Sequence, residues 1–245
     1  MKIILLGLYR IYQFVIMFPV VGVLTIITGL VTVIGSLLGG SRFWGYWPPH
    51  IWAKLCMWLS MARVEVRGRE NIDTDTSYVF VANHQGAYDI FTLYGFLNHN
   101  FKWMMKEGLR KFPVIGVSCA AAGQIFVDNS SPAAIRRTME KAEKTLRDGM
   151  SVAVFPEGSR SRTGRMGRFH TGAFRLALEF GMPVVPLTIN GAYSVLPRGS
   201  WLPHWGKITL TIHKPVAAPV DEADRRRVAD ESQEAIRSAL PERYR

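Results

Sequence analysis

The chain has 245 residues, enough for one sizeable α/β domain with an appended segment. A formal net charge of +11 and a pI of about 10.0 accompany 48% hydrophobic residues. A chain that is both basic and apolar suits an anionic membrane surface, whereas the scattered Lys and Arg residues argue against nucleic acid as a partner. Cys56 and Cys119 lie in apolar contexts without metal-ligand spacing, so we predict reduced packing residues and a main domain in the cytosol.

The first quarter of the chain predicts membrane attachment. No charged residue occurs from Ile11 to Leu38, and a helix of that length can cross a hydrocarbon core of about 30 Å. Pro19 and several glycines interrupt the run, so a kinked helix lying partly in one leaflet is an alternative. A secretory signal peptide fits less well, because the apolar run is too long for one.

An aromatic and basic stretch from Ser41 to Met61 follows the uncharged run, a mixture that settles where lipid headgroups meet acyl chains. Pro48 and Pro49 mark the start of a second, shorter helix. We therefore predict a membrane-anchoring helical segment over residues 1–62 and a separate α/β domain over residues 63–245.

Beyond residue 62 the pattern alternates between strand and helix. Strand patterns cover residues 63–67, 78–82, 101–105, 124–127, 152–155, 184–189 and 208–212, and helical patterns cover residues 87–97, 132–147, 171–180 and 221–240. Such alternation predicts an α/β fold whose mostly parallel sheet is flanked by helices on both faces.

The first polar cluster, from Asn83 to Asp89, lies where the predicted strand 78–82 ends and a helix begins. A histidine at a strand end and an aspartate one turn into the next helix can face each other. The Asp89 carboxylate would then accept the Nδ1–H of His84 and leave Nε2 free to take a proton. The alternative is that Asp89 only caps the helix and His84 packs in a turn.

The second cluster contains residues 154–168, where a predicted buried strand opens into a glycine-rich loop with four arginines. The guanidinium groups of such a loop suit a phosphate ester. Arginine runs are usually solvated faces, but this one follows a strand end, which favours anion binding.

These clusters resemble the motifs of the lysophosphatidate (1-acyl-sn-glycerol-3-phosphate) acyltransferases, within the glycerolipid acyltransferase family that carries a His-x4-Asp block. His84 and Asp89 match that block, in which the family's histidine is the general base and its aspartate the partner. Further matches are residues 123–128, residues 155–160, residues 185–187, and the intervening Lys106, Pro113 and Gly116. The second block commonly ends in Arg, but this chain has Asn129 there, which leaves the acceptor lipid open.

The resemblance implies a glycerol-3-phosphate acyltransferase-like fold and a 1-acylglycerol-3-phosphate O-acyltransferase. The enzyme would transfer a fatty acyl group from acyl-CoA or acyl carrier protein to the sn-2 hydroxyl and so form phosphatidic acid in phospholipid biosynthesis. No covalent acyl-enzyme is required, and backbone N–H groups near Gly158 could stabilise the oxyanion. The substrate-binding residues that the resemblance implies are Lys106, Gly123, Asp128, Glu157, Gly158, Ser159, Arg160 and Arg162.

We expect no cofactor other than the acyl donor and no metal ion, because the histidines lack a paired ligand spacing. The expected partners are membrane phospholipids, lysophosphatidic acid and the acyl donor, at the bacterial inner membrane with the catalytic domain facing the cytoplasm. Three alternatives remain: an acyltransferase for glycerol 3-phosphate or another lyso-lipid, a thioester hydrolase that uses water, and a noncatalytic basic membrane-binding module.

Overall fold

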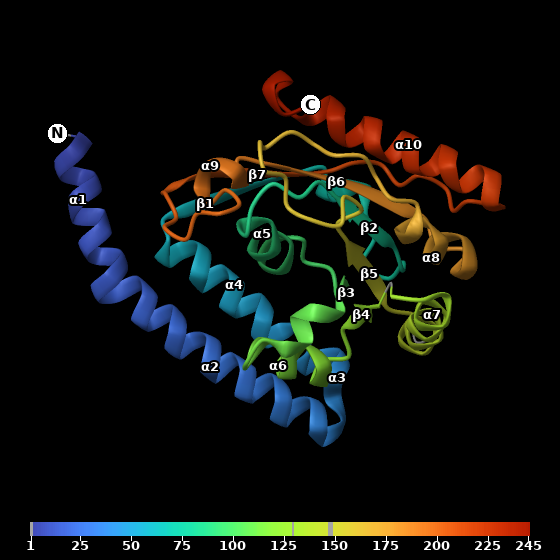
Figure 1. Cartoon of the computed structure of the whole chain (residues 1–245), viewed down its shortest axis with the longest axis horizontal. Helices are drawn as coiled ribbons and strands as arrows, with labels where there is room; N and C mark the ends of the chain where they lie inside the picture. The colour runs from blue at the N-terminus through green and yellow to red at the C-terminus, as the bar shows by residue number, and fades with distance from the viewer. Residues whose placement is uncertain (1, 129, 147–148) are drawn as a thin grey trace.

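The computed structural model describes residues 2–128, 130–146 and 149–245. Within these residues seven strands form one sheet in the order β1-β7-β6-β2-β5-β3-β4 (Figure 1). The strands are β1 (Ala62–Arg67), β2 (Val79–Ala82), β3 (Phe101–Lys106), β4 (Ile125–Val127), β5 (Ser151–Val154), β6 (Val184–Asn190) and β7 (Gly206–Ile212). Every predicted strand is present within two residues of its expected bounds.

The sheet is mostly parallel, as predicted, with one exception. Strand β2 lies between β5 and β6 and is parallel to both, while β6 and β7 pair in antiparallel fashion. Strands β2 and β5 are completely buried, which explains their continuous apolar sequences, because a sheet covered on both faces leaves no polar side. The antiparallel pair could not be foreseen, because side-chain periodicity carries no information about strand direction.

Helices cover both faces of the sheet. The α-helices of the described residues are α1 (Lys2–Tyr12), α2 (Phe18–Gly35), α3 (Ser41–Trp44), α4 (Trp47–Leu59), α5 (Tyr88–Phe96), α6 (Ile115–Ala121), α7 (Pro132–Leu146), α8 (Gly172–Phe180), α9 (Ala192–Val195) and α10 (Glu222–Ala239). One core cluster joins α4, α5 and α9 to the sheet, and a second joins α7, α8 and α10 to its other face. Alternate residues of β2 divide between them, with Phe80 in the first and Val81 in the second.

The apolar N-terminal run is a long helical stretch, Ile3–Trp44, which is kinked at Gly39 (φ 100°) and is long and apolar enough to cross a membrane. Helices α1 and α2 are joined by a π-helical turn over Gln13–Met17, in which the Phe18 N–H donates to the Gln13 carbonyl. Pro19 follows directly, and since it has no N–H it cannot complete the usual helical hydrogen bond to Val15. The expected interruption at Pro19 is therefore a local widening of the helix.

Helix α2 packs on α4 and on α6, a short helix that we did not predict. Its small residues allow this approach, because a Cβ atom on Gly29 would lie only 2.7 Å from Cγ1 of Val114. Helix α4 begins at Trp47, with prolines in its first turn as expected, and its Ala53 and Met57 belong to the core of the sheet domain. The proposed division of the chain at residue 62 stays a prediction.

Candidate active site

The candidate site lies at the carboxyl end of β2, near the middle of the sheet, where Asn83 to Ala87 connect the strand to α5. The buried Asn83 side chain holds this connection to β6, since its amide donates to the Ile189 carbonyl and accepts from the Ile189 N–H, both at 2.8 Å. Gly86 is required for packing, because a Cβ there would lie 2.6 Å from the Leu196 carbonyl oxygen. The polar loop is therefore clamped from two sides.

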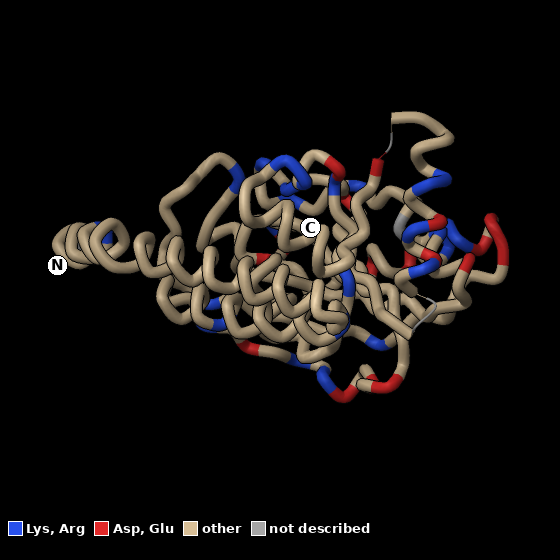
Figure 2. Tube along the Cα trace, turned by 90° about the horizontal axis from the view of Figure 1, so that it is seen from below, with Lys and Arg blue, Asp and Glu red and all other residues tan. Residues whose placement is uncertain are grey.

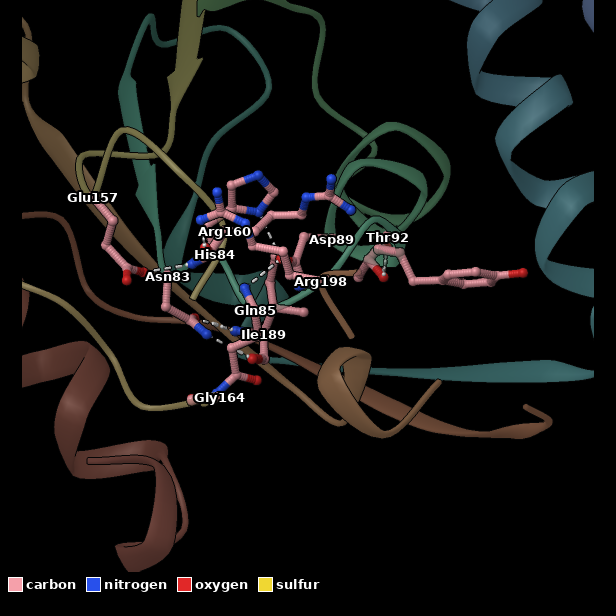
Figure 3. Close-up of polar contacts among 12 residues, drawn as sticks. Asn83, His84, Gln85, Asp89, Thr92, Glu157, Arg160, Gly164, Ile189 and Arg198 are labelled. Atoms are coloured by element: carbon pink, nitrogen blue, oxygen red, sulfur yellow. Dashed lines mark hydrogen bonds and ion pairs between the residues drawn. The ribbon is translucent and has the colours of Figure 1, made fainter. Parts of the chain in front are cut away.

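The structure brings His84 and Asp89 together. Nδ1 of His84 lies 2.7 Å from Oδ2 of Asp89, and the same oxygen accepts the N–H groups of Gln85 at 2.7 Å and Gly86 at 2.8 Å (Figure 3). Asp89 is completely buried in the first turn of α5, where the helix dipole also favours a negative charge. Asp89 is thus more than a helix cap, because one of its oxygens orients the histidine.

His84 is held in one orientation and remains accessible. Its ring stacks on Phe155 with centroids 3.8 Å apart and planes 7° apart, and 12% of its side chain is exposed. With Asp89 accepting from Nδ1–H, the other nitrogen carries the lone pair, and no hydrogen bond to a described residue occupies it. This geometry is the one that a general base requires.

The loop after β5 is fastened to the backbone of His84. Oε1 of Glu157 accepts the His84 N–H at 2.6 Å, and the His84 carbonyl accepts the Ser161 N–H at 2.8 Å. The second oxygen of Glu157 accepts the Gly167 N–H at 2.7 Å. The arginine-rich loop and the candidate base are therefore one connected unit. The Gly158 N–H, expected near the oxyanion, already donates to the Phe155 carbonyl.

Glu157 also predicts a pH dependence of stability. Burial raises the pKa of Glu157 above its usual value of 4.5, against the hydrogen bonds from Gly167 and His84. The folded protein therefore binds this proton more tightly than the unfolded chain, and the resulting stability is lost as the pH rises from about 4.5 through the folded pKa. We expect the stability of Glu157→Gln to fall less than that of wild type as the pH rises. The measurement is the thermal unfolding temperature in one detergent from pH 4 upward. The exposed Glu70→Gln is the control, and identical pH profiles for wild type and Glu157→Gln would contradict the prediction.

An open groove with a volume of about 370 Å³ lies beside the loop and is strongly basic. Its lining includes the predicted Glu157, Ser159, Arg160 and Arg162, together with Arg165, Arg168, His170 and Arg198. None of the groove's arginines forms an ion pair with a carboxylate in the described part of the chain, so their charges are free to bind an anion.

Two groove residues, His170 and Arg198, were missed by sequence reasoning. Arg198 donates to the Arg160 carbonyl at 2.9 Å, and it reaches the site because its neighbour Pro197 forms an antiparallel bridge with Gly86. No sequence signal marks this long-range contact. The His170 N–H donates to the Pro156 carbonyl at 2.9 Å. Because His170 directly follows the arginine-rich loop in the sequence, its presence in the groove could have been predicted.

Other predicted substrate-binding residues lie farther along the same sheet edge. Lys106 ends β3 and Asp128 follows β4, which puts Asp128 three strands from β2, roughly 14 Å at about 4.8 Å per strand. The Asp128 carboxylate accepts the Ser130 N–H at 2.9 Å, a local turn contact. Gly123 adopts a positive φ of 70° in the turn before β4. Their binding roles stay predictions, and Asn129 lies outside the described residues.

Neither cysteine has the character of a nucleophile. Burial raises the pKa of the Cys56 thiol to about 12 and that of Cys119 to about 11, which leaves little thiolate near neutral pH. Both cysteines are free. Among the described residues, no three His, Cys, Asp or Glu side chains gather where they could hold a metal ion.

Comparison with known proteins places these motifs in a family. The model of the acyltransferase family matches residues 63–190. A chloroplastic 1-acyl-sn-glycerol-3-phosphate acyltransferase of Brassica napus is 36% identical over 174 residues, which cover 68% of this chain and 50% of that protein. The 1-acyl-sn-glycerol-3-phosphate acyltransferase of Pseudomonas aeruginosa is 32% identical over 166 residues, covering 66% of this chain and 63% of that protein. The chain thus spans about half the length of the plant relative.

A solved structure resembles the whole fold. The crystal structure of the 1-acyl-sn-glycerophosphate acyltransferase from Thermotoga maritima superimposes with a TM-score of 0.78 at 27% sequence identity, and the match covers 97% of each chain. The family predicted from the ordered motifs is therefore confirmed, as is the fold class. The chain belongs to the acyltransferase family.

Proposed function

We propose that the protein transfers a fatty acyl group from a thioester donor to the sn-2 hydroxyl of 1-acyl-sn-glycerol 3-phosphate, giving phosphatidic acid. The observation that carries the proposal is the His84–Asp89 hydrogen bond of 2.7 Å, joined through Glu157 and Ser161 to a groove lined by unpaired arginines. The named activity of the relatives supports this choice of acceptor.

In the proposed mechanism Nε2 of His84 takes the proton of the lipid hydroxyl as its oxygen attacks the thioester carbonyl carbon. Asp89 stabilises the imidazolium that forms. When the tetrahedral intermediate collapses, the carbon–sulfur bond breaks and the imidazolium returns the proton to the leaving thiolate. The products are an ester and a free thiol, and general-base assistance of this kind typically contributes about 10²- to 10⁴-fold.

In this proposal the groove binds the phosphate group of the acceptor lipid. The side chains of Arg160, Arg162 and Arg198 lie beside the loop that is fastened to His84, so a phosphate held among them would keep the glycerol hydroxyl near Nε2. Arginine forks bind phosphate oxygens in pairs, which orients the ester as well as attracting it. Fixing the hydroxyl near the base lowers the entropic cost of reaching the transition state.

We further propose that the N-terminal helices lie along the membrane instead of crossing it. The helical stretch formed by α1 and α2 contacts the rest of the chain at two distant points. The Tyr9 hydroxyl donates to the Ser60 carbonyl at 2.8 Å, and Gly29 packs against Val114. These residues are 20 positions apart, roughly 30 Å along a helix, which equals the thickness of the hydrocarbon core. If this helix were perpendicular to the membrane, the parts of the protein that pack along it would have to enter the hydrocarbon core.

The charge distribution supports this orientation. Seen from the side of the N-terminal helices, the helical surface is almost free of Lys, Arg, Asp and Glu, which gather elsewhere on the molecule (Figure 2). Large apolar side chains are exposed on α2, α4 and α6, among them Leu30, Ile51 and Val117. One continuous apolar face therefore meets one leaflet, and we place it at the bacterial inner membrane with the catalytic domain in the cytoplasm.

Cysteine labelling tests the membrane orientation. We expect single cysteines introduced as Ile3→Cys and Ser41→Cys, in a Cys56→Ala/Cys119→Ala background, to react from the same side of the membrane in inside-out vesicles of the expression host. An impermeant maleimide is the reagent, and Ser238→Cys on α10 reports the side of the catalytic domain. Protection of one end of the helix until detergent is added would show that it spans the bilayer.

The activity is tested with the purified full chain, labelled acyl-CoA or acyl carrier protein thioester, and a panel of lyso-lipids with glycerol 3-phosphate. We expect labelled phosphatidic acid from lysophosphatidate and much less product from the other acceptors. Preferred labelling of another acceptor would replace lysophosphatidate in the proposal. Thioester consumption without labelled lipid would identify a hydrolase, and no consumption at all would indicate a noncatalytic membrane-binding protein.

A further inference from the structure

A second basic hollow lies next to the groove, and sequence reasoning gave no sign of it. It has a volume of about 430 Å³ and lies between residues 168–171 and the first turn of α10. Arg168 and His170 line both hollows, while Arg225 and Arg226 come from α10. Two binding spaces for anions therefore meet at one short segment.

The hollow carries uncompensated positive charge. Arg225 pairs with Glu222 at 2.6 Å, which neutralises one guanidinium. Arg168 and Arg226 form no ion pair in the parts of the chain that the structure describes. Two free guanidinium groups across one concave space suit a ligand with more than one phosphate, since each fork can bind a separate phosphate.

The hollow is connected to the candidate base by a short path. One carboxylate, that of Glu157, accepts the His84 N–H at 2.6 Å and the Gly167 N–H at 2.7 Å. Arg168 is the next residue, so the shared edge of the two hollows begins beside the segment that is fixed to His84. A ligand held there can extend a chain toward the reacting atoms.

The second hollow lies away from the apolar N-terminal helices. Helix α10 packs on β6 and α8, and it belongs to the core cluster on the sheet face opposite α4 and α5. Helix α4 in turn contacts α2, so α10 lies far from the apolar N-terminal helices (Figure 1). The hollow at α10 therefore lies away from the surface proposed above to meet the membrane, where a water-soluble substrate can reach it.

We propose that this hollow binds the phosphate groups of a coenzyme A thioester, with Arg168 and Arg226 as their ligands. The inference rests on the acyl-transfer function proposed above, which needs sites for two anionic substrates at once. Its volume falls within the range of about 300 to 1,000 Å³ that is usual for small-molecule sites. A carrier protein would instead need a contact surface of about 800 Å² on each partner.

Arg226→Ala provides the main test, because Arg226 is exposed and lies outside the groove. We expect the KM for acyl-CoA to rise about 5- to 20-fold on loss of one charged phosphate contact, while kcat and the KM for lysophosphatidate change less than about twofold. Arg237→Ala is the matched control on the same helix, roughly 16 Å away along the axis, and we expect it to leave all three constants unchanged.

Binding of adenosine 3′,5′-bisphosphate, a fragment of coenzyme A, tests the site without measuring catalysis. We expect it to bind wild type in calorimetry and to bind Arg226→Ala more weakly by a similar factor. An unchanged KM for acyl-CoA, or an equal rise in the KM of both substrates, would overturn the proposal. So would a rise confined to the KM for an acyl carrier protein thioester. Binding of the bisphosphate by a wild type that transfers no acyl group would refute the proposed function and leave the nucleotide site standing.

Discussion

Replacing His84 with Ala is expected to lower the kcat of acyl transfer by about 10²- to 10⁴-fold, because the lipid hydroxyl then has no group to accept its proton. The imidazole is oriented for this step, with Nδ1 bound to Asp89 at 2.7 Å and the ring stacked on Phe155. The measurement is the rate of labelled phosphatidic acid formation under saturating substrates.

A second variant separates chemistry from folding. His84→Gln can still donate a hydrogen bond toward Asp89 but cannot act as a base, so it is expected to lose activity to a similar degree. Thermal unfolding in the same detergent should remain close to that of wild type for His84→Gln, and vesicle binding should be unchanged for both variants. Substantial turnover by either variant would exclude His84 as the base.

Replacing Asp89 with Asn is expected to reduce kcat by about 10³- to 10⁴-fold, comparable to the loss when a histidine's partner aspartate is changed to asparagine in hydrolase triads. In wild type, Oδ2 of Asp89 accepts from His84, Gln85 and Gly86. An asparagine that keeps its oxygen in the place of Oδ2 can still accept these three N–H groups, but it carries no negative charge, and its NH₂ takes the place of Oδ1, which has no hydrogen-bond partner among the described residues. The imidazolium that forms when His84 takes the proton then lacks its stabilising carboxylate, and the transition state for proton transfer is higher in energy.

Asp73→Asn is the matched control for this loss, since Asp73 is an exposed carboxylate in the loop before β2. We expect its kinetic constants to remain those of wild type. The substrate KM values of Asp89→Asn should change far less than kcat, because Asp89 is buried and acts on the base and not on the lipid. A variant that lost affinity but kept its kcat would assign Asp89 a binding role in place of the proposed one.

Glu157 belongs to a family motif but has a structural role. In sequence it was expected to bind substrate, and in the structure both of its oxygens accept backbone N–H groups, from His84 and Gly167. Its carboxylate is therefore already committed to joining two loops. We infer that Glu157 positions the base and the arginine-rich loop, whereas Arg160 and Arg162 are free to face the phosphate.

Much of the fold could be predicted because the relevant information is local. The apolar runs of β2 and β5 report strands buried on both faces, and the polar residues that follow them mark the sheet edge where ligands bind. Helix α7 begins directly after Ser131, whose hydroxyl accepts the Ala134 N–H at 3.2 Å, and a serine before a helix is a local cap signal. Helix α6 was missed, because its short apolar sequence has no polar face, and its partner α2 supplies the packing surface.

The sequence by itself determined the strand and helix segments, the apolar N-terminal helix and the spacing that lets His84 meet Asp89, since each depends on residues close together in the chain. Only the tertiary structure decided the order of strands in the sheet, the antiparallel pairing of β6 with β7, and the arrival of Arg198 at the groove through the Gly86–Pro197 bridge. It also placed Arg226 and Arg168 in the lining of one hollow. The physical reason is that side-chain pattern records whether a residue is buried, whereas the identity of its distant neighbour is set by the packing of the whole domain.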